Sequence, residues 1–322
     1  VLVTSAASDV ALQHETELLR VCRPLGKLLV GNVERTKPYP AGADDWTHPY
    51  HGPDNNPQSL DRLARFPYVT QFLAEPYFVP FPEVTVTASG RIFKAFGHIA
   101  FKQREWPWLN SLIAINGYNG TLLWRRELEP GYIIHRNTMI ATDQTLYVGD
   151  GTSCKLINTS TGELTGEIKA PPGSSGSAWK WMAIVEGVLY AMLGESEPPV
   201  ETLRKNLDRG GWPWDDWEGF RLDDYQTGLG RTLCAFDLSS RELLWMHSEM
   251  DQLDGRSIAM KDERIYFYSH STCLAAVDAK SGQVIWRNSD RELLDAIGQF
   301  DKAQHAGKGF FTSAFMLSLI HI

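Results

Sequence analysis

The densest group of residues that could do chemistry is a cluster of acidic and histidine side chains. The sequence D-D-W-T-H-P-Y-H-G-P-D (44–54) contains Asp44, Asp45, His48, His51 and Asp54. Two histidines three positions apart can ligate one metal ion, and nearby carboxylates can complete the coordination shell. Two prolines place the cluster in an irregular loop, so a second interpretation stays open. The sequence predicts either a metal site on His48 and His51 or a hydrogen-bonded connector that docks two parts of the chain.

A tryptophan-rich insertion at about residues 195–231 is the next candidate for binding. Its sequence G-G-W-P-W-D-D-W-E-G-F (210–220) places Trp212, Trp214 and Trp217 beside acidic residues. Exposed aromatic rings beside carboxylates suit sugar stacking or a protein partner. The same rings could instead fold back over the domain. The sequence therefore leaves two interpretations, packing and the binding of a glycan or protein partner.

The elements that must position these residues come from a repeat of about 40 residues. Its four turn anchors are 42, 79 and 41 residues apart: Asn116, Asn158, Asp237 and Asp278. Three copies carry a tryptophan eight residues after the anchor, at positions 124, 245 and 286. Four short strands per period of ~40 residues are typical of a propeller blade, with large rings packed between blades. We predict an all-β chain, a partial β-propeller of about four blades preceded by a short α/β remnant.

Four polar residues align where the innermost strand of each repeat is expected to begin: Glu83, Asn137, Lys180 and Arg256. Each stands ten residues before the aromatic residue of the next strand motif. The innermost strands of a propeller surround its central channel. We expect these side chains to ring a channel mouth, where they could bind a small polar or anionic ligand together with their neighbours His135 and Arg136. An ordinary polar, water-filled mouth is the alternative.

The repeat L-A-A-V-D-A-K-S-G-Q-V-I-W (274–286) resembles the PQQ-like repeat of quinoprotein β-propellers. With the motif at 44–56 and R-N-S-D-R-E-L-L-D-A-I-G (287–298), the chain resembles large bacterial proteins known as PQQ-binding-like propellers. The resemblance implies a noncatalytic propeller, like the outer-membrane assembly lipoproteins, or an alcohol dehydrogenase that uses pyrroloquinoline quinone (PQQ) and calcium. It points to a periplasmic or cell-envelope location, which the sequence itself leaves unknown.

Dehydrogenases of this type hold calcium with acidic and amide side chains, use an aspartate as base and often carry two adjacent cysteines. This chain has four widely spaced cysteines, at positions 22, 154, 234 and 273. Most of its Asp and Asn residues fall in repeat turns, where hydrogen bonds to the backbone explain them. We therefore expect a noncatalytic binding or scaffold module, with a PQQ-dependent oxidoreductase as the alternative.

Residues 1–34 follow a different pattern, with helical spacing over 9–24 and an apolar strand at 27–33. The run L-L-R-V-C-R-P-L-G-K-L-L-V resembles the late part of a class I methyltransferase domain. This resemblance implies a C-terminal remnant, with methyl transfer only in a longer protein. An unrelated αβ unit is the alternative.

Composition shifts divide the rest of the chain. We expect a connector rich in Pro and Asn at 35–82, propeller blades at 83–316 and a short helix soon after residue 286. The final residues 317–322, L-S-L-I-H-I, resemble a translated sequencing adapter, so we expect a non-native tail on a metagenomic fragment.

Charge and hydropathy restrict the partners. The 322 residues carry a net charge of −8 without a basic run, which argues against a nucleic-acid surface. The sequence has no apolar stretch of about 18 residues, so we expect no membrane span in it. A small polar ligand, a glycan or a protein remains as the expected partner.

Overall fold

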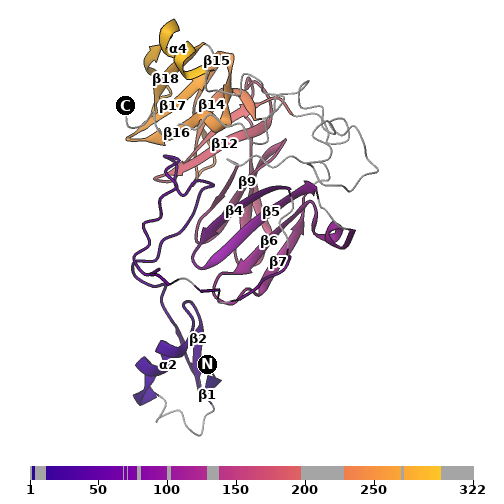
Figure 1. Cartoon of the computed structure of the whole chain (residues 1–322), viewed down its shortest axis with the longest axis vertical. Helices are drawn as coiled ribbons and strands as arrows, with labels where there is room; N and C mark the ends of the chain where they lie inside the picture. Colours follow the sequence, from indigo (N-terminus) through magenta and orange to yellow (C-terminus); the bar gives the residue numbers. More distant parts are fainter. Residues whose placement is uncertain are drawn as a thin grey trace.

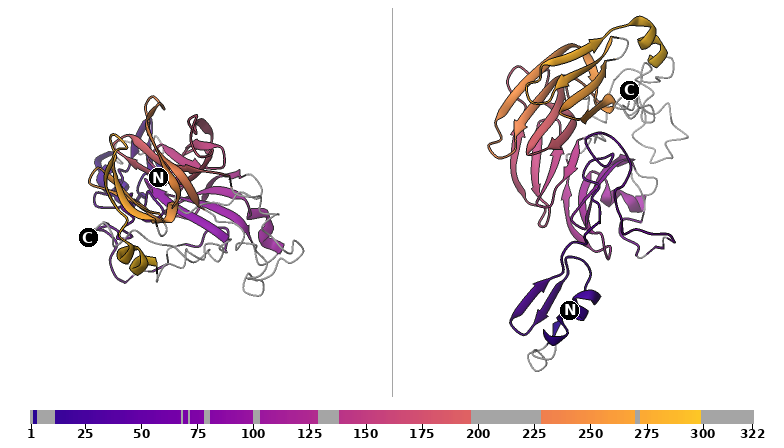
Figure 2. Two further views of the ribbon diagram at one scale, coloured as in Figure 1. Left: turned by 90° about the horizontal axis from the view of Figure 1, so that it is seen from above. Right: turned by 90° about the vertical axis from the view of Figure 1, so that its left-hand side faces the viewer.

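The structure is a computed structural model, which describes residues 2–3, 12–67, 69–70, 72–77, 81–99, 103–128, 138–196, 228–269 and 272–298. It is dominated by four four-stranded antiparallel sheets that lie side by side as propeller blades (Figure 1). Two further views show the same arrangement, with a small N-terminal unit projecting from one end (Figure 2). The prediction of a partial β-propeller after a short α/β unit is confirmed.

Each blade is a meander in which strands that follow one another in the chain are hydrogen-bonded neighbours. Blade 1 contains β4 (Phe81–Ala88), β5 (Arg91–Ile99), β6 (Ser111–Asn116) and β7 (Leu122–Glu127). Blade 2 contains β8 (Met139–Ala141), β9 (Thr145–Gly149), β10 (Ser153–Asn158) and β11 (Leu164–Lys169). Blade 3 contains β12 (Ala178–Val185), β13 (Val188–Gly194), β14 (Leu229–Asp237) and β15 (Leu243–Asp254). Blade 4 contains β16 (Ile258–Lys261), β17 (Arg264–Ser269), β18 (Cys273–Asp278) and β19 (Val284–Asn288). Two 3₁₀ helices accompany the blades, η2 (Gln103–Trp108) and η4 (Gly255–Ser257).

The middle strands are buried on both faces, because every blade packs against a neighbour or a cap. All six residues of β6 are buried, as are five of the six in β18. The outermost strands β7 and β19 are mainly exposed. The core therefore consists of successive apolar layers between blades, and the inner strands β4, β8, β12 and β16 lie at the edge opposite the exposed strands.

The repeat anchors build the turn between the third and fourth strands. Their side-chain oxygens accept the backbone N–H two residues on, at 2.9 to 3.0 Å in all four blades. Each anchor carbonyl also accepts the N–H four residues on. These Asn and Asp side chains therefore have a structural role in turn formation.

Tryptophans wedge two of the blade interfaces, as the repeat predicts. Trp124 of β7 packs on Gly162 in the turn of blade 2, and Trp245 of β15 packs on Gly282 in blade 4. A Cβ at Gly162 or Gly282 would lie 2.7 or 2.6 Å from the ring, and both glycines have positive φ. The indole N–H groups of Trp124 and Trp245 donate to the carbonyls of Thr159 and Ala279 at 2.9 and 2.7 Å. The interface thus requires both a large ring and a glycine.

The interface between blades 2 and 3 reverses this pair. Blade 2 has Gly166 at the tryptophan position, and blade 3 has Arg241 at the glycine position of the turn. A Cβ added to Gly166 would overlap the guanidinium group of Arg241. The backbone of Arg241 has a φ of +63°, in the left-handed region that favours glycine. At this interface Arg241 of blade 3 therefore fills the space that the tryptophan of the preceding blade fills at the other two interfaces.

This exchange predicts energetic coupling between the two positions. Gly166→Trp alone should be destabilising, because the new ring overlaps the Arg241 side chain. Combined with Arg241→Gly it recreates the Trp and Gly pair of the other interfaces. A double-mutant cycle by urea unfolding should give a favourable coupling of about 1 to 3 kcal/mol. Additive effects of the two substitutions would contradict this account of the interface.

Segments outside the repeats cover the two outer blades. Phe72 lies against Gly120 of blade 1, in the position that a preceding blade's tryptophan occupies elsewhere. At the other end, helix α4 (Arg291–Gly298) packs Leu294 and Ile297 against a cluster that includes Trp286. The expected helix after residue 286 is confirmed. Both segments act as caps for apolar blade faces.

The N-terminal unit contains β1 (Leu2–Val3), α2 (Glu15–Val21), β2 (Lys27–Val30) and β3 (Val33–Thr36). Strand β1 is parallel to β2, and β2 forms an antiparallel hairpin with β3. The strand expected over residues 27–33 is shorter in the structure, because β2 ends at Val30 where the hairpin turn begins. Leu18 and Leu19 of α2 pack against buried Leu28 and Val30. No helix among the described residues is long and apolar enough to cross a membrane.

Several expectations need adjustment or lie outside the described residues. The last residues of the expected insertion, 229–231, belong to strand β14. Residues 197–227, with Trp212, Trp214 and Trp217, lie outside the described residues, as do His135, Arg136, Asn137 and residues 299–322.

Candidate functional site

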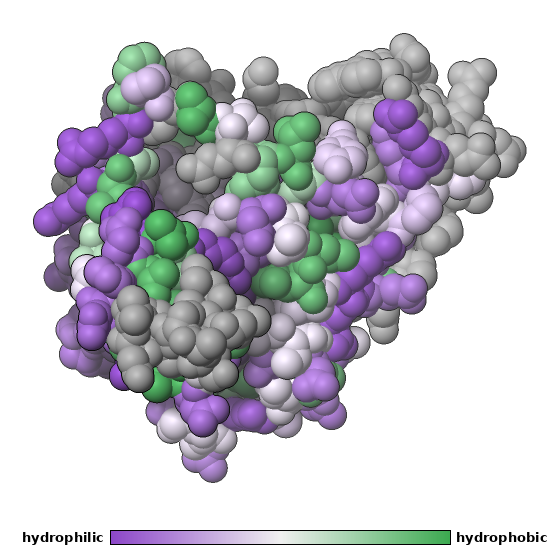
Figure 3. Space-filling model, turned by 90° about the horizontal axis from the view of Figure 1, so that it is seen from below, coloured by the Kyte–Doolittle hydropathy of each residue, from purple (hydrophilic) through white to green (hydrophobic). Residues whose placement is uncertain are grey.

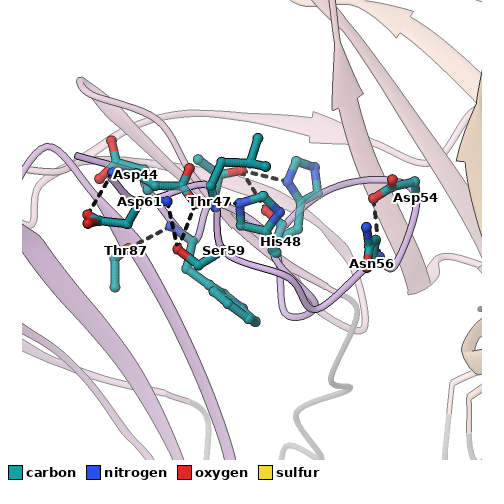
Figure 4. A network of polar contacts seen from close by, with 12 residues as sticks. Asp44, Thr47, His48, Asp54, Asn56, Ser59, Asp61 and Thr87 are labelled. Carbon is teal, nitrogen blue, oxygen red and sulfur yellow. Dashed lines mark hydrogen bonds and ion pairs between the residues drawn. The ribbon is translucent and has the colours of Figure 1, made fainter. Parts of the chain in front are cut away.

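Residues 44–56, here called the strap, contact the inner strands of all four blades. Figure 4 shows part of the strap, with Asp44, Thr47, His48 and Asp54 labelled. One backbone N–H from each inner strand donates to an acceptor of the strap, and the strap meets the blades in chain order. The pairs are Thr87 to the Trp46 carbonyl (2.7 Å), Ala141 to the Thr47 carbonyl (2.9 Å), Ile184 to the His48 ring Nε2 (3.2 Å) and Met260 to the Pro53 carbonyl (2.7 Å).

These four donors occupy one equivalent position of the repeat. Each lies four residues after a predicted channel-mouth residue and six before the aligned aromatic residue. We call Thr87, Ala141, Ile184 and Met260 the inner row. The strap therefore meets the four repeats at the same level of the propeller.

Side chains fix the two ends of the strap. At blade 1, Ser89 N–H donates to both Asp45 carboxylate oxygens at 3.0 Å, and Trp46 N–H donates to the Thr87 hydroxyl. At blade 4, the Asn55 side-chain amide donates to the Ile258 carbonyl at 2.7 Å. The strap is thus anchored on the first and last blades.

His48 is one of the two buried side chains of the strap, with 6% of its surface exposed. Its Nε2 accepts from the Ile184 N–H, so the proton of the neutral ring lies on Nδ1, 2.8 Å from the Thr47 hydroxyl. The Thr47 hydroxyl donates in turn to the His51 carbonyl at 3.3 Å. Burial, and secondarily the nearby His51, lowers the pKa of His48 to about 4. His48 is therefore held as a neutral hydrogen-bonding group.

Asp44 organises the outer side of the strap. It accepts from the His51 ring at 2.8 Å, from Leu60 N–H at 2.6 Å and from the Ser59 hydroxyl at 3.1 Å (Figure 4). Burial raises the pKa of Asp44, but these hydrogen bonds outweigh it and leave the pKa below its usual value. The aspartate thus ties the strap to the following loop.

This geometry favours the docking interpretation of the 44–54 motif over the metal site on His48 and His51. Both ring nitrogens of His48 are engaged in hydrogen bonds, and His51 is paired with Asp44. Within the described ranges no group of three His, Cys, Asp or Glu side chains could hold a metal ion. His48 cannot hold a metal ion while it bonds to Thr47 and Ile184.

The predicted channel-mouth residues lie at or near the starts of the inner strands. Glu83 is in β4, Lys180 is the third residue of β12, and Arg256 lies in η4 just before β16. The side chain of Glu83, like Asn137, lies outside the part of the chain that the structure describes. Blades 3 and 4 approach closely here, because a Cβ on Gly255 would lie 2.5 Å from the Lys180 carbonyl oxygen. The structure thus brings the segments of Lys180 and Arg256 together.

The charged residues near the starts of β12 and β16 are largely enclosed. Lys180 is 2% exposed and Asp254 is fully buried. Arg256 forms hydrogen bonds to both Asp254 oxygens, with its Nη2 at 2.5 Å from Oδ2. A bidentate pair of this kind is strong and directional. Sequence alignment of the repeats found Lys180 and Arg256 but missed Asp254, which precedes the aligned position by two residues.

Comparison with known proteins supports the repeat family. Residues 225–296 match the PQQ_2 family model, which is described as outer membrane protein assembly factor BamB. A sequence search of the curated proteins found no match. The matches support the propeller and give no support to a methyltransferase-like origin of residues 1–34.

Solved structures with similar folds include enzymes and an assembly factor. The quinohemoprotein alcohol dehydrogenase of Comamonas testosteroni has a TM-score of 0.50 at 12% identity, over 77% of this chain and 41% of that chain. BamB of Moraxella catarrhalis has a TM-score of 0.38 at 10% identity, over 63% of this chain and 47% of that chain. This chain spans less than half the length of both, and such identities bear on the fold alone. The sheets show a partial β-propeller, and within it residues 225–296 are similar to the PQQ_2 repeat described for BamB.

Proposed function

We propose that this chain is a noncatalytic binding or scaffold module whose partner is a protein. The observation that carries the proposal is the strap, which occupies the inner row of all four blades with the chain's own residues. A module of this kind keeps its blades in fixed relative positions and presents its outer surface to a protein partner. Seen from below, from the end that carries the N-terminal unit, the surface shows hydrophobic residues interspersed with hydrophilic ones (Figure 3).

The alternative is a PQQ-dependent oxidoreductase of the alcohol dehydrogenase type, which the fold permits. The inner-edge residues that the structure describes do not fit PQQ with calcium. The strap occupies the inner row, and Asp254 is paired with Arg256. Among the described residues, no group of three or more His, Cys, Asp or Glu side chains is arranged to hold a metal ion. These features support the binding module.

The same proposal includes the division of the chain and its location. Residues 35–82 serve as a connector that includes the strap, and residues 83–316 form the blades with their insertion. The resemblance to envelope proteins supports a periplasmic or cell-envelope location. In that setting the tryptophans of the insertion, Trp212, Trp214 and Trp217, are candidates for contact with the partner.

The test is a titration of the full chain with PQQ and calcium, followed by quinone absorbance and dye-linked alcohol oxidation. We expect no saturable binding and no turnover, while thermal melting shows that the protein is folded. A quinohemoprotein alcohol dehydrogenase serves as the positive control. Saturable binding with turnover, lost in Lys180→Met, would overturn the proposal in favour of the oxidoreductase.

A further inference from the structure

The strap is attached to the blades by hydrogen bonds and not by an apolar core. Among residues 44–56 only His48 and Asn55 are buried, and both are polar. In the described structure, the apolar clusters between blades contain no residue of the strap. Segments with few buried apolar contacts open at a lower free energy than the core that they cover.

The inner row beneath the strap has the character of a binding edge. Its four N–H groups come from four different blades and recur at one repeat position, 54, 43 and 76 residues apart. Exposed strand edges bind extended polypeptides through backbone N–H and C=O groups. In this structure three of the four acceptors are backbone carbonyls of one segment, which turns back at His48–His51, and the fourth is a side chain of the same segment.

We propose that the strap is a latch, which opens without unfolding the blades and then leaves the inner row free to bind a polypeptide segment through its backbone carbonyls. The latch is an autoinhibitory contact in cis, because the strap and an incoming segment need the same four donors. It goes beyond the proposed scaffold role and does not depend on whether the propeller binds a quinone.

His48 is the residue through which the latch can be tested. It supplies the acceptor for Ile184 and holds Thr47, whose carbonyl accepts from Ala141. Its removal therefore weakens contacts to blades 2 and 3. His247 is a matched control, because it is a partly buried histidine that hydrogen bonds to Glu249 at 2.8 Å on β15, an outermost strand.

The experiment is residue-resolved hydrogen exchange on the full chain. We expect the four inner-row amides to exchange together and at least about tenfold faster than the amides of the central strands β14 and β18. In His48→Ala the inner row should exchange about five- to tenfold faster again, as expected from the loss of one hydrogen bond of about 1 kcal/mol. His247→Ala should leave the inner row unchanged.

Exchange of the inner row only at the rate of global unfolding would overturn the latch. This measurement needs only the chain without substitutions, so it can be made even if His48→Ala does not fold. Asn55→Ala provides a second variant with a weakened latch. The binding part is tested with a fluorescent peptide of residues 43–57. Anisotropy should show saturable binding to the weakened variants and none to the original chain, whereas no binding to a variant with a rapidly exchanging inner row would refute the polypeptide site.

Discussion

Acidification from pH 7 to pH 4 is expected to remove about 3 kcal/mol of folding free energy through His48 alone, at about 1.4 kcal/mol per pKa unit. The pKa of His48 is about 4 in the folded chain, against 6.5 for an ordinary histidine. Because the folded pKa is the lower one, the unfolded state binds the proton first as the pH falls. The contribution of His48 is complete above pH 6.5 and is lost progressively toward pH 4.

Urea unfolding at a series of pH values measures this loss, with His48→Asn as the comparison. Asparagine retains hydrogen-bonding capacity but does not titrate, so the stability difference between the two proteins should shrink by about 3 kcal/mol between pH 7 and pH 4. Carboxyl groups with lowered pKa values, such as Asp44 and Glu249, are present in both proteins and cancel in the difference. Parallel stability curves for the two proteins would contradict the neutral, buried His48.

Trp124→Ala is expected to destabilise the chain by about 3 to 5 kcal/mol, the usual range for removal of a buried large aromatic ring. Trp124 is 8% exposed, packs on Gly162 of the next blade and donates its indole N–H across the interface. The substitution leaves a cavity between blades 1 and 2 and an unpaired carbonyl at Thr159.

Trp106→Ala is the matched control, because Trp106 lies in η2 with 53% of its surface exposed. Its replacement should change the unfolding free energy by less than about 1 kcal/mol. Equal effects of the two substitutions in urea unfolding would mean that Trp124 is not the wedge between blades.

The blades are predictable from sequence because their determinants are local and repeated. An Asn or Asp anchor, a turn and a tryptophan eight residues later specify the last turn and the wedge of a blade within about a dozen residues. Gly166 and Arg241 show the limit of this reasoning. The missing tryptophan of blade 2 was visible in the sequence, but its compensation by an arginine of the next blade required the structure.

The path of the strap could not be predicted in the same way. Its contacts join residues far apart in the chain, up to the 203 positions between Asn55 and Ile258. No local pattern marks an acceptor for a distant backbone N–H, so the histidine spacing at 48 and 51 left a metal site open beside the connector. The constant offset between the inner row and the predicted mouth residues could have shown that one level of the propeller is special, but not what occupies it.

The mouth residues were placed by repeat alignment and not by chemistry. The alignment located Lys180 and Arg256 near the starts of inner strands, because strand starts recur with the repeat. It could not show that Lys180 is enclosed or that Arg256 pairs with Asp254, since burial and pairing depend on how blades 3 and 4 approach each other.

The most direct test of the strap as an internal occupant of the propeller is a nitrogen NMR spectrum of the full chain labelled at histidine. His48 should appear as a single neutral tautomer, with a proton on Nδ1 and an unprotonated Nε2 that shows scalar coupling to the Ile184 amide nitrogen. This state should persist well below pH 6.5, because the pKa of His48 is about 4. A His48 ring that averages its tautomers and titrates near pH 6.5, with no coupling to Ile184, would contradict the strap.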